Sequence, residues 1–135
     1  MSTNAGSAPN GKSVLFDSMV LIDHLRGIQQ ATEFLLRLES HNLGCVSAVT
    51  RAEVLTGCGA DTEAVVGEIL DRYRFLPAGK RVADAAARLR RRYRWALPDA
   101  MQAATAQVHG LALATRNTRD FPPDRHDFVV FPYSL

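Results

Sequence analysis

Cysteine, histidine and long apolar runs are scarce in this 135-residue chain. Its two cysteines, Cys45 and Cys58, form no C-x-x-C pair, and its four histidines show no zinc-ligand spacing, which argues against a zinc module. We expect both cysteines to be small buried side chains rather than a disulfide or reactive thiols. No apolar run approaches the length of a membrane span, and the polar start lacks the apolar segment of a secretory signal. The sequence therefore predicts a cytoplasmic protein without membrane contact.

Lysine is also scarce, and the net charge is small. The 16 basic residues against 14 acidic ones give only +2, so charge alone does not indicate nucleic-acid binding. All basic residues except Lys12 and Lys80 are arginine, whose planar guanidinium suits phosphate. A hydrophobic fraction of 47% is enough for one core at this length, which excludes a two-domain enzyme. We expect a loose tail over residues 1–12 and one domain over residues 13–135.

Short apolar runs alternate with helical periodicity along the domain. The expected strands cover residues 13–16, 44–47, 75–76, 111–115 and 128–131, and the expected helices cover residues 19–26, 30–39, 49–56, 62–73, 81–95 and 98–109. This alternation is typical of an α/β fold in which helices cover both faces of a parallel sheet. On one helix we expect Val65, Ile69 and Tyr73 to share the buried side. Ligands of such sheets bind outside the carboxyl ends of the strands, which locates the site.

Acidic residues stand at successive ends of the predicted strands. Asp17 follows the first strand, and Glu53 lies on the helix after the second. Asp99 opens the last helix, and Asn117 and Asp120 share the loop after the fourth strand. Because parallel strands end at the same edge of a sheet, these side chains should lie close together. Carboxylates at close range shift their pKa values or recruit a cation, and Mg²⁺ or Mn²⁺ suits such oxygen ligands.

Each acid also has a purely structural explanation. Asp17 can cap the helix that follows it, and Asp99 can be a first-turn acid stabilised by the helix dipole. Asp120 can close a turn. For one acid alone the structural interpretation is favoured, whereas the joint placement at strand-to-helix junctions favours a functional site.

Glu53 has the sharpest alternative. The segment Thr50-Arg51-Ala52-Glu53 has the pattern of a capping box, in which Glu53 reaches back to the backbone of Thr50. If the helix instead begins near Ser47, Glu53 lies inside it and cannot cap. The first start makes Glu53 structural, and the second leaves its carboxylate free for chemistry.

Four segments taken together resemble the acidic motifs of PIN-domain ribonucleases, and of the VapC-type toxins of toxin–antitoxin pairs in particular. The segments are VLFDSMVLIDHLRG, SAVTRAEVLTG, LPDAMQAATA and LATRNTRDF. The resemblance runs from about Val14 to Phe131, in order and with family-like intervals. It implies a compact three-layer α/β/α fold with a central parallel sheet, and a metal-dependent RNA endonuclease.

The resemblance also implies roles for the acids. Asp17, Glu53 and Asp99 match the residues that hold Mg²⁺ or Mn²⁺ in the family. We hypothesise that Asp17 and Asp99 are the principal ligands and that Glu53 completes the coordination or orients the attacking water. Asn117 and Asp120 are expected to hold a second ion or its waters. These five residues form the predicted catalytic set, and no nucleophilic side chain is required.

The same resemblance implies partners. A VapC-type toxin acts on RNA needed for translation, forms a homodimer and is covered by a small VapB-type antitoxin. The chain departs from the family after Ser18, where Met19 stands in place of a Ser or Asn. A PIN-like module that has lost turnover and acts only through protein binding is therefore the alternative function, with Met19 as its supporting feature.

Arginines gather in two places. Arg116 and Arg119 lie beside the predicted ion, and we expect them to hold an RNA phosphate. The cluster from Arg88 to Arg94 lies on a helix whose predicted apolar face ends at Tyr93, and a solvated helix face explains it without RNA. Trp95 can stack on a base, but a helix-end aromatic of this kind is expected in the core.

Two other enzyme classes place an Asp after the first strand, and each needs a residue that is missing. A haloacid-dehalogenase-like phosphatase needs a second Asp two positions on, where Met19 stands. A response-regulator receiver needs a lysine beyond the later strands, and the chain has only Lys12 and Lys80. Residue content thus argues against both classes.

Overall fold

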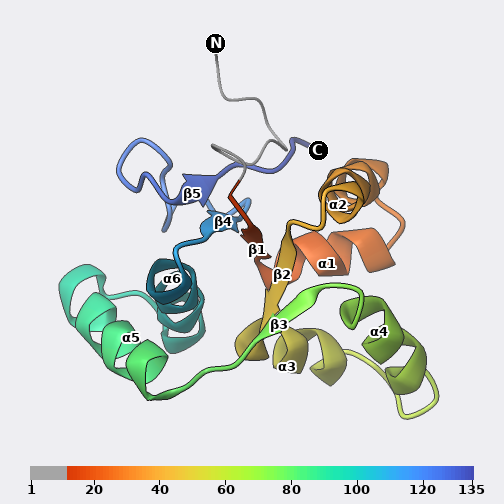
Figure 1. Ribbon diagram of the computed structural model, residues 1–135, viewed down its shortest axis with the longest axis horizontal. Helices are drawn as coiled ribbons and strands as arrows, with labels where there is room; N and C mark the ends of the chain where they lie inside the picture. The colour runs from red at the N-terminus through yellow and green to blue at the C-terminus, as the bar shows by residue number, and fades with distance from the viewer. Residues whose placement is uncertain (1–11) are drawn as a thin grey trace.

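Residues 12–135 are described by a computed structural model, in which they form five strands and six helices (Figure 1). The expected tail over residues 1–12 lies outside the described residues, apart from Lys12. All strand pairs are parallel, in the order β3-β2-β1-β4-β5. Their bounds are β1 Val14–Phe16, β2 Gly44–Ser47, β3 Arg74–Leu76, β4 Ala112–Ala114 and β5 Val129–Val130. The α/β fold class predicted from the sequence is confirmed.

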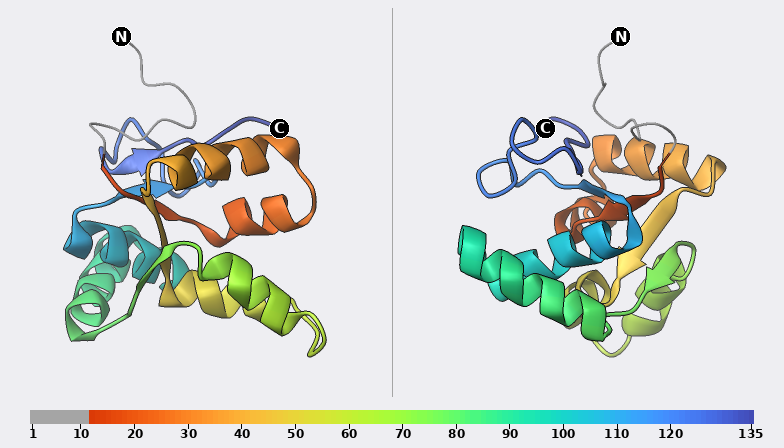
Figure 2. Two further views of the ribbon diagram at one scale, coloured as in Figure 1. Left: turned by 45° about the vertical axis from the view of Figure 1, so that its right-hand side comes forward. Right: turned by 60° about the vertical axis from the view of Figure 1, so that its left-hand side comes forward.

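Helices cover both faces of this sheet, as Figures 1 and 2 show. Their bounds are α1 Ser18–Leu25, α2 Gln29–Ser40, α3 Ala48–Thr56, α4 Glu63–Leu70, α5 Lys80–Tyr93 and α6 Leu97–His109. Helices α1 to α4 form one hydrophobic cluster with one face of the sheet, and α5 and α6 form a second cluster with the other face. The three α/β/α layers are therefore as predicted. None of the helices within residues 12–135 has the length and apolar character of a membrane span.

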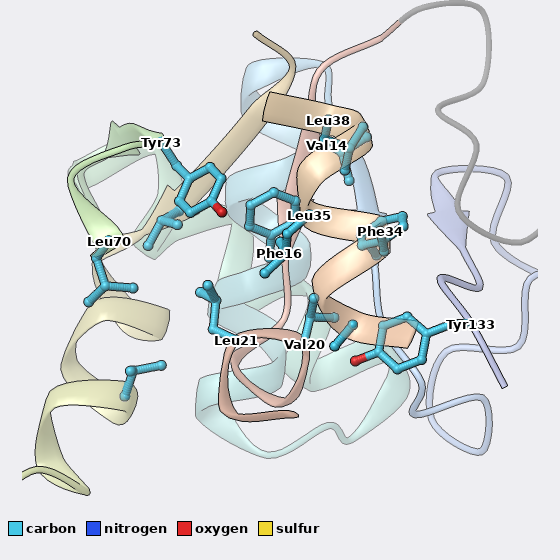
Figure 3. Packing of buried hydrophobic residues seen from close by; sticks show 14 of the residues in the cluster. Val14, Phe16, Val20, Leu21, Phe34, Leu35, Leu38, Leu70, Tyr73 and Tyr133 are labelled. Atoms are coloured by element: carbon cyan, nitrogen blue, oxygen red, sulfur yellow. The ribbon is translucent and has the colours of Figure 1, made fainter. Parts of the chain in front are cut away.

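Alternate residues of each strand supply the two clusters. Val14 and Phe16 of β1 face α1 to α4, whereas Leu15 between them faces α5 and α6. A strand covered on both faces requires this period of two. Figure 3 shows Phe16 inside the first cluster, where its ring centroid lies 5.0 Å from that of Tyr73 and 6.1 Å from that of Phe34, both edge to face. These aromatic contacts hold β1, the strand that leads into the site.

Two predictions about burial are wrong in detail. Val65 is 59% exposed, because α4 turns Val66 and Leu70 toward the core in its place. Cys58 is only half-buried, whereas Cys45 is buried as predicted, and both are free thiols. The predicted burial is therefore confirmed for Cys45 and holds only in part for Cys58.

The strand order creates a switch point at the carboxyl end of β1. From β1 the chain runs outward through β2 to β3, and then continues on the other side of β1 through β4 and β5. The segments that follow β1 and β4 therefore diverge next to each other. Such switch points are where doubly wound sheets bind ligands. Asp17 follows β1 and Asp120 follows β4, so the fold places both at this point.

Replacing Gly44 with alanine should destabilise the protein by about 1–3 kcal/mol, the range found for overpacked cores. A Cβ at position 44 would lie 2.7 Å from ring atoms of both Phe16 and Tyr73, so both rings would have to move. Gly57→Ala is the matched control, because a Cβ there meets only the Val54 carbonyl oxygen at 3.6 Å. Chemical unfolding of both variants checks this, and equal stability of the two would contradict the close packing around Phe16.

Candidate active site

Asp17 is held between the ends of β1 and β4. It is the N-cap of α1, and its Oδ1 accepts a hydrogen bond of 2.7 Å from the backbone N–H of Ser18. Its Oδ2 accepts a second bond, also 2.7 Å, from the hydroxyl of Thr115, the residue that follows β4. The capping role expected for a structural Asp is thus present. The second carboxylate oxygen is turned instead toward the loop that carries Asn117 and Asp120.

Glu53 lies inside α3, so the capping-box interpretation is wrong. The N-cap of α3 is Ser47, whose Oγ accepts a bond of 3.0 Å from the backbone N–H of Thr50. The helix begins at Ala48, which places Glu53 in its second turn. There the carboxylate accepts a hydrogen bond from the hydroxyl of Ser18, the neighbour of Asp17 in the chain.

Asp99 stands in the first turn of α6 and is half-buried. Its pKa is raised, first by burial and then by the negative charges of Asp17, Asp120 and Glu53. The pKa of Asp17 is also raised, mainly by burial, with the charge of Glu53 adding to the effect and its bonds to Thr115 and Ser18 opposing it. The four acids therefore share one electrostatic environment, as the strand-end pattern predicted.

Asn117 and Asp120 form a hydrogen-bonded pair in the loop after β4. The Asn117 amide donates to the Asp120 carboxylate at 3.0 Å, and the Asp120 backbone N–H donates to the Asn117 side-chain oxygen at 3.3 Å. The Asn117 backbone N–H also donates to the Thr115 hydroxyl at 3.0 Å. Thr115 consequently links this pair to Asp17. Asp120 also closes the turn, as expected for a structural residue, and it belongs to the acidic cluster as well.

The oxygen atoms of this cluster fit a hard divalent cation in their chemistry. Carboxylates with an amide nearby are the ligands that Mg²⁺ and Mn²⁺ prefer. Within residues 12–135, no three His, Cys, Asp or Glu side chains are arranged so as to hold one ion as they stand. Asp17, Glu53 and Asp120 each accept hydrogen bonds from neighbouring donors, and because a carboxylate has about four lone-pair sites, these bonds orient the acids and leave sites for an ion.

Buried hydrogen bonds beneath the acids support them, and these bonds were not predicted from the sequence. The Ser47 hydroxyl donates to the side-chain oxygen of Gln102 at 2.7 Å, and the Gln102 amide donates to the hydroxyl of Thr50. Thr50 donates in turn to the carbonyl oxygen of Phe16 at 3.1 Å. All three polar side chains are buried. The available signal was the amide of Gln102 among the alanines of α6, one turn after Asp99.

Arg116 is committed to a buried ion pair. Its Nε and a terminal guanidinium nitrogen each lie 2.9 Å from Oδ2 of Asp23, which is 2% exposed. The hydroxyl of Tyr133 donates to the same oxygen at 2.7 Å. The predicted contact of Arg116 with RNA phosphate stays a prediction, and the observed role is to tie the loop after β4 to α1 and to the C-terminal segment. Arg119 differs, because 91% of its side chain is exposed and it lies 4.0 Å from Asp120.

Comparison with known proteins places this geometry in a family. Residues 14–123 match the PIN domain family. The chain is 37% identical over 114 residues to Ribonuclease VapC10 of Mycobacterium tuberculosis, a match that covers 81% of this chain and 86% of that protein.

Solved structures with the same fold include toxin–antitoxin complexes. A toxin–antitoxin complex from Klebsiella pneumoniae matches with a TM-score of 0.81 and 33% identity, over 91% of this chain and 100% of that one. The FitAcB structure from Neisseria gonorrhoeae matches with a TM-score of 0.71 and 30% identity, over 90% of this chain and 99% of that one.

Gln102→Met should destabilise the protein by about 1–3 kcal/mol, because it leaves the buried hydroxyls of Ser47 and Thr50 without the amide that pairs them. Gln107→Met is the matched control, since Gln107 lies on the same helix and is exposed. Urea unfolding measures both free energies. Two variants of equal stability would show that the buried contacts contribute nothing.

Arg116→Met should cost about 3 kcal/mol of stability, because it leaves the buried Asp23 carboxylate without its counter-charge. Arg119→Met, at an exposed position, should change stability by no more than about 0.5 kcal/mol. Adding Asp23→Leu to Arg116→Met should recover part of the loss, since the unpaired charge is then gone. Failure of the second change to recover any stability, measured by chemical unfolding, would contradict the pairing as the cause.

Proposed function

The chain belongs to the PIN-domain family and is a VapC-type ribonuclease toxin of a toxin–antitoxin module, and from this we propose that it cleaves RNA internally with a divalent cation. We assign Asp17, Glu53 and Asp99 as the residues that hold Mg²⁺ or Mn²⁺. The observation that carries the proposal is the gathering of Asp17, Glu53, Asp99 and Asp120 near the ends of β1 and β4, where burial first and then the charges of the other three acids raise the pKa of Asp99. Such a cluster is costly to keep ionised unless a cation compensates it.

The cation supplies an activated water and compensates the charge that develops on the phosphate. The residues of the chain position the groups around it. Thr115 and the Ser18 backbone orient Asp17, while the Ser18 hydroxyl orients Glu53. Burial raises the pKa of Asp17, and its hydrogen bonds to Thr115 and Ser18 oppose that rise, so the bonds favour the ionised form that binds metal.

Asn117 and Asp120 extend the acidic cluster toward the loop after β4. Because each is bonded to the other, they act as one unit whose free oxygens can bind a second ion or its waters. Arg119 lies beside this unit with an exposed side chain, which suits it to the phosphate of a bound RNA. Arg116 is paired with Asp23, so we assign it the positioning of this loop, in addition to the predicted contact with an RNA phosphate.

We propose a small VapB-type antitoxin as the partner of this chain, because two of its structural relatives carry toxin–antitoxin names or titles. The antitoxin is expected to cover the acidic cluster, which would otherwise be open to RNA. A homodimer in the cytoplasm and an arrest of translation complete the proposal. Both follow from the family resemblance.

The alternative of an inactive binding module depends on Met19. Met19 is 38% exposed on α1, next to Ser18 and two residues from Asp17. It provides no polar group at that position. Ser18, which precedes it, contacts Glu53 by hydrogen bond, so the acids keep one hydroxyl donor here.

Asp99→Asn should abolish metal-dependent cleavage and, without metal, should raise the melting temperature at neutral pH. The fold disfavours the charged form of Asp99, so that destabilising effect is present above its raised pKa and disappears at acidic pH, where the carboxyl is protonated both folded and unfolded. The stabilisation of the variant should therefore shrink as the pH falls. Mn²⁺ should raise the melting temperature of the wild type and much less that of the variant.

Thermal melts with EDTA or Mn²⁺, together with cleavage of total RNA, make these measurements. Asp84→Asn is the control, because Asp84 is an exposed acid on α5. Cleavage should fall by more than the roughly 10–100-fold seen when only a neighbour of a metal ligand is changed. Retained cleavage in Asp99→Asn would refute the assignment, whereas a wild type that binds Mn²⁺ but leaves RNA intact would favour the inactive module.

A further inference from the structure

A cavity adjoins the acidic cluster. It is lined by residues at and just after the end of α5 and by residues of the segment that joins β4 to β5, and its volume is about 480 Å³. Its walls include the aromatic rings of Tyr93, Trp95 and His126 and the side chains of Arg94, Arg119 and Arg125. Asp120 of the acidic cluster also lines it, so the cavity opens beside the proposed metal site.

The aromatic rings form a rigid wall. Tyr93 stacks on Trp95 with ring centroids 4.6 Å apart and an angle of 16° between their planes. His126 meets Tyr93 at 5.1 Å and Trp95 at 5.3 Å, in both cases edge to face. The Trp95 indole N–H donates to the backbone oxygen of Asp120 at 3.1 Å. This bond fixes the aromatic wall relative to the acidic cluster.

Tyr93 is more exposed than its place on the apolar helix face predicted. Its helix face was predicted to be buried, and Trp95 is indeed 6% exposed, but Tyr93 is 37% exposed. An aromatic ring that is packed on one side and open on another can accept a flat ligand. His126 adds a ring whose pKa is lowered by burial and by the nearby Arg125 and Arg92, which favours its neutral form.

Three of the side chains that line the cavity are positively charged. Arg94, Arg119 and Arg125 are all exposed, and the guanidinium of Arg92 lies 5.1 Å from the centre of the Tyr93 ring. Arg94 ends α5 in the left-handed region, at a φ of 59°, a conformation that normally favours glycine. The left-handed conformation is unfavourable for arginine, and such strained residues cluster at functional sites, which is consistent with a functional role for the Arg94 side chain. Several guanidinium groups beside flat rings suit phosphate and base together.

We infer that this cavity, which we call the nucleotide pocket, binds one nucleotide of single-stranded RNA next to the cleaved bond. The base packs against the wall of Tyr93, Trp95 and His126, and its phosphates lie against Arg119 and Arg125. The inference rests on the proposed function for the neighbouring metal site. The volume is in the range of small-molecule pockets, and stacking on aromatic side chains is the usual way in which proteins hold unpaired bases. The arginines favour an anionic ligand over a basic peptide segment.

Trp95 is the only tryptophan of the chain, so its fluorescence reports on this pocket directly. A mixed-sequence, fluorescein-labelled RNA dodecamer is titrated into the full-length protein in EDTA, with anisotropy for affinity and Trp95 emission for location. Saturable binding that changes the Trp95 emission is expected. Tyr93→Leu should weaken binding by about tenfold, within the range for loss of one stacked base, whereas Tyr93→Phe should bind as the wild type does.

Arg125→Gln should also weaken binding and should lower the slope of log affinity against log salt by about one. Arg81→Gln is its matched control, an exposed arginine at the other end of α5. Thermal melts check that every variant is folded. Cleavage by the Mn²⁺-loaded Tyr93→Leu and Arg125→Gln variants should need a higher RNA concentration, in step with their loss of affinity, whereas Arg81→Gln should cleave as the wild type does.

Three results with RNA would overturn the nucleotide pocket, and one with a peptide would do so as well. The three are RNA binding that leaves Trp95 emission unchanged, equal affinity in Tyr93→Leu and the wild type, and equal displacement of the RNA by polyphosphate, which has no bases. A peptide from the antitoxin that binds the pocket while RNA does not would also overturn it. Failure of the proposed function gives a different pattern, because Asp99→Asn and the wild type would then both bind RNA with a Trp95 response and neither would cleave it.

Discussion

The acidic cluster depends on a buried hydrogen-bond chain beneath it. Gln102 of α6 pairs with Ser47 at the end of β2 and with Thr50 in α3, and Thr50 continues to the carbonyl oxygen of Phe16 at the end of β1. A polar group of this network that lost its partner would cost about 1–3 kcal/mol, because it is buried. The hydrogen bonds therefore fix how α6 and α3 pack against β1. Asp99 lies on α6, Glu53 lies on α3 and Asp17 directly follows β1, and Asp99 stands one turn before Gln102. The mutual repulsion of the acids is therefore opposed by contacts that bear no charge.

Much of the fold and the position of the acids could be predicted from the sequence, because the signals are local. Short apolar runs that alternate with helical periodicity define the parallel sheet, and a parallel sheet brings the ends of its strands to one edge. Asp17 directly follows a strand and Asp99 opens a helix, so their common position follows from the topology alone. For Glu53 the sequence offered two helix starts, and the hydroxyl of Ser47 decides between them by capping α3.

The rest could not be predicted, because it depends on contacts between residues distant in the chain. Gln102 looks like an ordinary polar residue of an alanine-rich helix, and only its partners some 50 positions earlier show its role. Arg116 looked free to bind phosphate until Asp23, 93 positions earlier, was found beneath it. Tyr93 fits an apolar helix stripe, yet the end of α5 at Arg94 leaves its ring half open to the nucleotide pocket. Periodicity predicts which side of a helix faces the core, but it does not predict where along that side the neighbouring elements leave a residue exposed.

The central claim is that acids far apart in the sequence share one divalent ion. Crystals of the protein grown with Mn²⁺ test it directly, because anomalous diffraction locates manganese independently of the protein atoms. The account predicts an anomalous peak at the carboxyl end of β1, in contact with carboxylate oxygens of both Asp17 and Asp99. A manganese peak elsewhere on the protein, in contact with neither the Asp17 nor the Asp99 carboxylate, would contradict this claim.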